Sequence, residues 1–328
     1  MHDIPYLLEA PRLRIQNANA NSSPHTWGFP AMSAFVGLMH ALERRLHNEG
    51  LELQLDSVGV ICHRHEPQVS RTGFTHAFHL TRNPVDKKGD TAAIVEEGRT
   101  HLEITLVFAA SGQAAEDHRQ GTGPDLEAAI AEILPTLRVA GGSVQPPLAR
   151  RGATPRPSLI PVEEGEEDRE RQARRLLRRW LPGFALLSRD DLLHAHLAHL
   201  QETDPETDLL EAWLDLARLN WAAHRETPED GGQEQVAWAR RGPPKGWLVP
   251  IPVGYGALGP LHEAGTVEGA RDEGTPLRFV ESLYSIGEWK SPHRLQSPAD
   301  LLWYVDNREE EGLYHLRNDY NPILQTTT

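Results

Sequence analysis

Segments with strand periodicity and segments with helix periodicity alternate along the first half of the sequence, and their order restricts the fold more than any other feature. Residues 12–16 alternate apolar and hydrogen-bonding side chains, as in a half-buried strand. After Pro30, apolar residues recur at helical spacing up to Gly50. Further strands are expected at 58–62, 101–108 and 143–148, and a second helix at 126–137. This order predicts an α+β protein with a ferredoxin-like, split βαβ core.

The connection between the second and third expected strands, about residues 64–97, is too long for an ordinary loop. It is rich in His, Arg, Asn and Gly. Long connections inside compact domains commonly carry function. We therefore expect an inserted arm or hairpin that takes part in ligand binding.

The second half has a different character. Acidic residues followed by arginines over residues 163–179 predict a helix whose charges suit its dipole. Further helices are expected from Ser188 and after Pro205. Residues 227–246 are polar and rich in Gly and Pro, as in a loop, and residues 247–255 are extended and apolar.

A Pro/Arg-rich segment near residue 148 separates the two halves. We therefore expect residues 1–148 to form the core with its inserted arm. Residues 149–328 are expected to form a mostly helical or irregular part that contacts other subunits.

The cellular compartment follows from two features. The single cysteine, Cys62, excludes a disulfide framework and is typical of a reducing cytoplasm. Residues 1–10 lack the features of a signal peptide, and no run of about 18 apolar residues occurs. We expect a cytoplasmic protein with no membrane contact.

The charge is unevenly distributed. The chain has 33 basic and 47 acidic residues, a net charge of −14, which argues against binding nucleic acid through net charge alone. Residues 1–160 hold 15 basic and 17 acidic residues, so the excess lies in the second half. Arginine makes up 29 of the 33 basic residues. Arginine suits phosphate and base contacts, although a GC-rich genome also favours it. A nucleic-acid surface is therefore expected in the first half.

Motifs of common nucleotide-binding, hydrolytic and zinc sites are absent. Two groups of histidines, within residues 62–79 and 194–199, have spacings that point their side chains to different sides. We therefore expect these histidines to be surface or interface residues, and we expect no metal and no cofactor. A ribonuclease that uses a histidine as general base is the alternative, with the candidates His63, His65, His76 and His79.

The segment that follows the first strand, residues 15–30, is rich in amides and hydroxyls that can contact bases and backbone, and its tryptophan can stack on a base. The alternative is that the Asn and Ser side chains only tighten a turn. The expected third strand shows no outward aromatic pair, so loops and the arm must hold any RNA. The RNA-binding candidates are Gln16, Asn17, Asn19, Ser23 and Trp27 in this segment, and Arg64, Gln68, Arg82 and Asn83 in the arm.

Eight sequence strings between Pro11 and Arg317 resemble, in order and spacing, a family of CRISPR-associated proteins. They include Arg14 to Ala20, Thr26 to Pro30, Arg138 to Ser143 and Leu248 to Pro252. The family is the Csy-type, Cas-five-like subunit that binds the five-prime handle of crRNA in type I-F CRISPR surveillance complexes. It is a member of the repeat-associated RNA-binding (RAMP) superfamily.

The resemblance implies a non-catalytic RNA-binding subunit with an RRM-like RAMP core and a thumb-like arm. The implied partners are the crRNA handle, the large Csy subunit in a heterodimer, a Csy backbone subunit, and target DNA reached through the complex. A metal-independent endoribonuclease that cuts the CRISPR repeat is the alternative. By matching strings, the resemblance also places the turn Gly141, Gly142 and Ser143 at the RNA, where bare backbone can approach phosphate.

Overall fold

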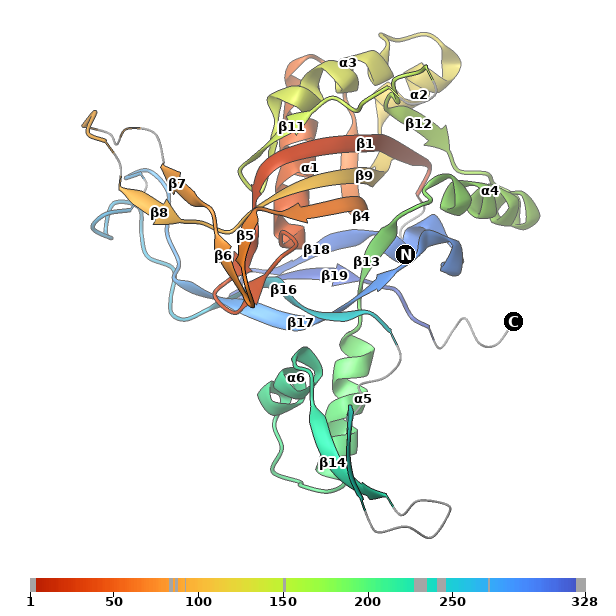
Figure 1. Cartoon of the computed structure of the whole chain (residues 1–328). Coiled ribbons are helices and arrows are strands. Elements are labelled where there is room, and N and C mark those ends of the chain that lie inside the picture. Colours follow the sequence, from red (N-terminus) through yellow and green to blue (C-terminus); the bar gives the residue numbers. More distant parts are fainter. Residues whose placement is uncertain are drawn as a thin grey trace.

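The computed structural model describes residues 4–82, 85, 88–91, 93–149, 152–226, 235–240, 246–270 and 272–322 (Figure 1). The elements of the first part are β1 (Tyr6–Asn19), β2 (Asn21–Ser23), β3 (Thr26–Trp27), α1 (Met32–Asn48), β4 (Gln54–Pro67), β9 (Arg99–Ser111), α2 (Gln113–Gln120), α3 (Leu126–Ile133), η1 (Leu134–Thr136), β10 (Arg138–Val139) and β11 (Gly142–Gln145). The strands and the two helices expected from periodicity are therefore confirmed. Short helix α2 was not predicted, because it buries only two alanines and has no apolar stripe.

The long strands of the first part lie in the order β11-β1-β9-β4, and each neighbouring pair is antiparallel. Helices α1 and α3 pack on one face of this sheet (Figure 1). The apolar positions that predicted α1, among them Phe35, Leu38 and Leu42, are all buried. Helix α3 ends just before Pro135, as expected of a residue without an amide hydrogen.

The inserted arm consists of two hairpins. They are formed by β5 (Val69–Thr72) with β6 (Thr75–Phe78), and by β7 (Leu80–Arg82) with β8 (Ile94–Glu96). Figure 1 shows both hairpins projecting from the end of β4 and β9. Within the described residues these hairpins form the inserted arm that was predicted at about 64–97, but the arm begins later than expected, because residues 64–67, including Arg64, belong to β4.

The elements of the second part are β12 (Ser158–Pro161), α4 (Glu166–Arg179), β13 (Phe184–Ser188), α5 (Asp190–Gln201), α6 (Leu209–Ala217), β14 (Trp221–Glu226), β15 (Gln235–Arg240), β16 (Leu248–Ala257), β17 (Val280–Lys290), η2 (Pro292–Arg294), η3 (Pro298–Leu301), β18 (Trp303–Arg308) and β19 (Leu313–Asn318). The expectation of a mostly helical second part was wrong, because strands dominate it. These strands are half-exposed and mix polar with apolar residues, so their sequences contain no clear apolar stripe that would predict them.

The strands of the second part continue the sheet of the first. From β4 the order runs β13-β17-β16-β19-β18, and β18 returns to pair with β4 where Trp303 lies opposite Val58. Six strands, β4 included, therefore form a closed ring of pairings. The indole of Trp303 is fully buried and donates to the Leu186 carbonyl at 2.9 Å. The main core thus contains residues from both sides of residue 148, and a division there stays a prediction.

Helix α4 covers the opposite face of β4 and β9. Leu176 and Trp180 of the helix pack there against Ile61 and Val107. The end of the helix is tied to β1 by an ion pair of 3.1 Å between Arg179 and the buried Glu9. No helix among the described residues has the length and apolar character needed to span a bilayer.

Candidate nucleic-acid interface

The last residues of β1 form a bulge that exposes two of the predicted amides. Asn17 has a positive φ of 58°, and the register of β1 on β9 shifts between Ile15 and Ala18. The Asn17 N–H donates to His101 Nδ1 at 3.1 Å, and the Arg99 guanidinium donates to the Asn17 carbonyl at 3.5 Å. The backbone of Asn17 is therefore fixed, while the side chains of Gln16 and Asn17 are exposed to solvent.

Two other predicted residues stabilise the turn itself. Asn19 Oδ1 accepts from the Asn21 N–H at 3.0 Å, and Asn19 Nδ2 donates to the Asn21 carbonyl at 3.0 Å. Ser23 Oγ lies 2.6 Å from Thr26 Oγ1 and accepts from the His25 N–H at 3.2 Å. Asn19 and Ser23 therefore tighten the turn, as the alternative interpretation of the Asn and Ser residues expected.

The glycine turn lies directly beside this bulge. Ser143 is the register partner of Gln16. Gly141 is exposed with a φ of +74°, whereas Gly142 is buried against β1. A Cβ on Gly142 would lie 2.7 Å from Ala18 N and 2.9 Å from the Gln16 carbonyl oxygen. The close approach of the two backbones therefore requires glycine at 142, and it brings two separately predicted segments together.

The base of the arm lies against the same turn. The rings of Trp27 and Phe78 are 5.7 Å apart, and Trp27 is about half exposed. The Gln68 N–H donates to the Arg99 carbonyl at 2.8 Å. Arg64 forms an ion pair of 2.6 Å with Glu66. Arg82 belongs to β7, but its side chain, like all of Asn83, lies outside the described residues.

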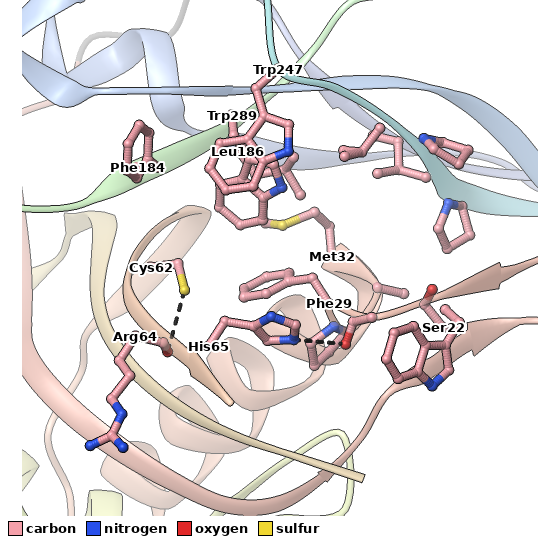
Figure 2. A pocket seen from close by; sticks show the side chains of 18 of the residues that line it. Ser22, Phe29, Met32, Cys62, Arg64, His65, Phe184, Leu186, Trp247 and Trp289 are labelled. Carbon is pink, nitrogen blue, oxygen red and sulfur yellow. Dashed lines mark hydrogen bonds between the residues drawn. The ribbon is translucent and has the colours of Figure 1, made fainter. Parts of the chain in front are cut away.

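An aromatic pocket of about 570 Å³ opens between this turn and the second part of the chain (Figure 2). Trp27 and Phe29 come from the turn, and Phe184, Trp247 and Trp289 come from β13, the start of β16 and β17. Phe29 contacts Trp289 edge-to-face at 4.8 Å, and Phe184 contacts Trp247 in the same way at 5.3 Å.

Sequence reasoning missed the three aromatic residues of the second part. Trp247 stands at the head of a segment predicted to be extended and apolar, which was the only available signal. Nothing in the sequence joined that segment to Trp27, because the contact depends on β13 pairing with β4 and on β17 pairing with β13.

The titratable side chains of the pocket are already engaged. Nδ1–H of His63 donates to the Pro182 carbonyl at 2.6 Å, which leaves Nε2 as the acceptor from Thr105 Oγ1 at 2.8 Å. Burial lowers the pKa of His65, whose Nε2–H donates to the Gly28 carbonyl, so this ring is neutral at pH 7. Burial also raises the pKa of the Cys62 thiol to about 12.

These protonation states limit the chemistry of the pocket. A thiol that stays protonated is a poor nucleophile and a poor metal ligand. His63 has no free ring nitrogen with which to accept a proton from substrate. Among the residues that the structure describes, no three His, Cys, Asp or Glu side chains are grouped so that they could hold a metal ion. The pocket therefore offers stacking surfaces, neutral polar groups and the guanidinium of Arg64, which is paired with Glu66.

These features define a strand-rich α/β protein with an antiparallel sheet, a projecting arm and an open aromatic pocket. Residues 8–316 match the family described as CRISPR-associated protein (Cas_Csy2). The chain is also 48% identical over 311 residues to CRISPR-associated protein Csy2 of Pseudomonas aeruginosa (strain UCBPP-PA14), and the match covers 94% of each chain. The chain belongs to the Csy2 family. The resemblance to a Csy-type protein of type I-F CRISPR systems is thereby confirmed.

Proposed function

We propose that this chain is a non-catalytic, cytoplasmic RNA-binding subunit that holds the five-prime handle of crRNA in a type I-F surveillance complex. The observation that carries the proposal is the meeting of three separately predicted segments. The bulge at Asn17, the turn at Gly141 and the base of the arm at Gln68 and Phe78 adjoin one another through direct contacts.

The strand order supports a ferredoxin-like RAMP core for this function. The antiparallel order β11-β1-β9-β4, with α1 and α3 on one face, is the arrangement in which a split βαβ unit is built. In this proposal the core occupies residues 1–148, and residues 149–328 supply most subunit contacts.

The two sides of the interface would contribute differently to RNA binding. Exposed amides of Gln16 and Asn17 can donate to and accept from base edges and 2′-hydroxyls, which gives selectivity. Stacking on the aromatic pocket tolerates any base and adds affinity. Arg64 and Arg99 lie at the margin, although each is paired with a glutamate, Glu66 and Glu97 respectively.

The partners follow from the family. The proposed assembly contains the crRNA handle, the large Csy subunit as heterodimer partner and a Csy backbone subunit, and it reaches target DNA through pairing with the guide. The endoribonuclease alternative gains no support: both ring nitrogens of His63 are occupied, and burial lowers the pKa of His65. His76 and His79 are exposed residues of the arm.

The test uses the chain assembled with its Csy partners and a labelled handle RNA. Replacing both exposed amides (Gln16→Ala with Asn17→Ala) should weaken RNA binding by roughly 1–3 kcal/mol, since their RNA partners would lose hydrogen bonds. Gln120→Ala, an exposed amide at the end of α2, is the matched control. Unchanged affinity of the double variant, or specific cleavage of the handle by the wild type, would refute the proposal.

A further inference from the structure

A small module made of α5, α6 and the β14–β15 hairpin projects from the sheet in a direction different from that of the arm (Figure 1). Its base is firmly attached. Trp213 of α6 is buried against Ile286, and its indole donates to the Ser285 carbonyl at 3.0 Å. This small core joins the module to β17.

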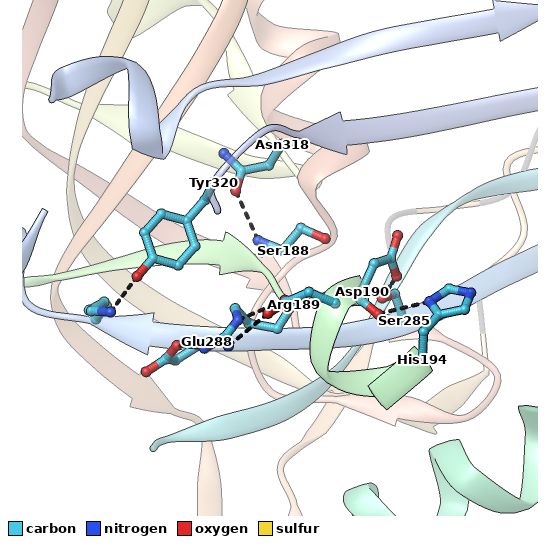
Figure 3. A network of polar contacts seen from close by, with 10 residues as sticks. Ser188, Arg189, Asp190, His194, Ser285, Glu288, Asn318 and Tyr320 are labelled. Carbon is cyan, nitrogen blue, oxygen red and sulfur yellow. Dashed lines mark hydrogen bonds and ion pairs between the residues drawn. The ribbon is translucent and has the colours of Figure 1, made fainter. Parts of the chain in front are cut away.

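A polar network fixes the point where α5 leaves the sheet (Figure 3). The buried Arg189 forms ion pairs with Asp191, at 2.9 Å, and with Glu288 of β17. The Ser285 hydroxyl donates to Asp190, and His194 Nδ1–H donates to the Asp190 carbonyl at 2.8 Å. The module is therefore held at its base by both apolar and charged contacts.

Several large apolar side chains of the module are exposed. Trp221 is 61% exposed and Trp238 is 66% exposed. Exposed apolar groups gathered on one small element mark an interaction surface. The apolar residues are Leu210, Leu214, Leu219, Trp221, Val236 and Trp238.

The hairpin concentrates these residues on one of its faces. Trp221 pairs with Arg240, Ala223 with Trp238 and Arg225 with Val236. Trp221, Trp238 and Val236 therefore share one face with Ala223, and they are flanked on it by Arg225 and Arg240. Among the described residues, β14 and β15 pair only with each other. A two-stranded hairpin is marginal by itself, so a partner packed on its apolar face would stabilise it.

The charge of the module selects the kind of partner. Beyond the network at its base, residues 192–240 hold ten acidic residues, three arginines and no lysine, a net charge of −7 out of −14 for the chain. Such a surface repels phosphate backbones and complements a basic protein surface.

We propose that this module is a docking surface for a protein subunit that presents apolar side chains inside a rim rich in Lys and Arg. The subunits to test are the other Csy proteins of the same system, a choice that rests on the proposed function. The proposed contact is between proteins and does not involve RNA. RNA binding and protein docking can therefore fail separately.

The experiment measures binding of the full-length chain to each purified Csy subunit, without RNA. Trp221→Ser with Trp238→Ser should weaken binding to one subunit at least tenfold and leave handle-RNA binding by the assembled complex unchanged. Leu258→Ser, which changes an equally exposed apolar residue outside the module, should leave subunit binding unchanged.

A second variant guards against a folding defect. Glu202→Lys with Glu206→Lys reverses two exposed charges without touching the small core, and it should weaken the same contact with a reduced dependence on salt. Carbodiimide coupling should join carboxylates of residues 202–215 to lysines of that subunit. The proposal is overturned if no subunit binds the wild type, if both variants bind every subunit as the wild type does, or if the changes abolish RNA binding instead.

Discussion

Placing a methyl group at Gly142 tests whether the close approach of β11 to β1 builds the interface. The backbone of Gly142 is outside the left-handed region, so alanine there meets only a steric obstacle. Its Cβ would lie 2.7 Å from Ala18 N and 2.8 Å from Ala18 Cα, and ordinary contact begins at 3.4 Å. These are backbone atoms of β1, which β9 holds by a ladder of hydrogen bonds, so they cannot rotate away.

Strand β11 must therefore move outward by about 0.7 Å, the difference between the 2.7 Å approach to Ala18 N and the 3.4 Å at which ordinary contact begins. Overpacking of this kind costs roughly 1–3 kcal/mol. Urea unfolding of the chain, followed by tryptophan fluorescence, should report that loss for Gly142→Ala. Handle affinity of the assembled complex should fall as well, because Ser143 moves away from Gln16.

The neighbouring glycine provides the control. Gly141 has a φ of +74° and no atom within 4 Å of an added Cβ, so Gly141→Ala pays only the backbone cost, about 1–2 kcal/mol. Asparagine enters this region more easily, so Gly141→Asn should recover much of that loss. At residue 142, asparagine should recover none. A Gly142→Ala protein as stable as the wild type, or recovery by asparagine at both positions, would refute the steric argument.

Two further outcomes are expected. Burial raises the pKa of Glu9 above 4.5, against the opposing charge of Arg179. The folded chain therefore holds this proton more tightly than the unfolded chain, so this carboxyl makes the fold less stable as pH rises above 4.5. Glu9→Gln should remove that part of the pH dependence of the free energy of unfolding. If the free energy of unfolding of the variant changed between pH 4 and 7 as steeply as that of the wild type, this prediction would be wrong. Separately, Trp247→Ala should weaken handle binding by roughly 1–3 kcal/mol per stacked base, whereas Trp221→Ala should not. Equal effects of the two changes would contradict a stacking role for the pocket.

The first part of the fold was predictable because its signals are local. Alternation at Leu13 and Ile15, and helical spacing from Phe35 to Leu46, each describe one element packed on one core face. In the second part, the extended segment at residues 247–255 was predicted and is found as β16, where Pro250 and Pro252 lie beside β17. The expectation of a mostly helical part was wrong because the strands around β16 are defined by their neighbours rather than by a local pattern.

The candidate site divides in the same way. The polar segment around Asn17 and the paired glycines were visible as unusual local composition, and the structure brings them into contact. Trp289 carried no such signal, because it reaches Phe29 only after β17 joins the sheet. Pairings between distant strands cannot be read from a single sequence without information on contacts.

Strand β4 pairs with β9, β13 and β18 and ends at Pro67, at the root of the arm. One continuous strand is therefore part of the first sheet, of the closed ring of strand pairings and of the base of the arm. The proposed RNA interface and the proposed docking module are therefore connected through β4 and the strands that pair in sequence from it, β13 and β17.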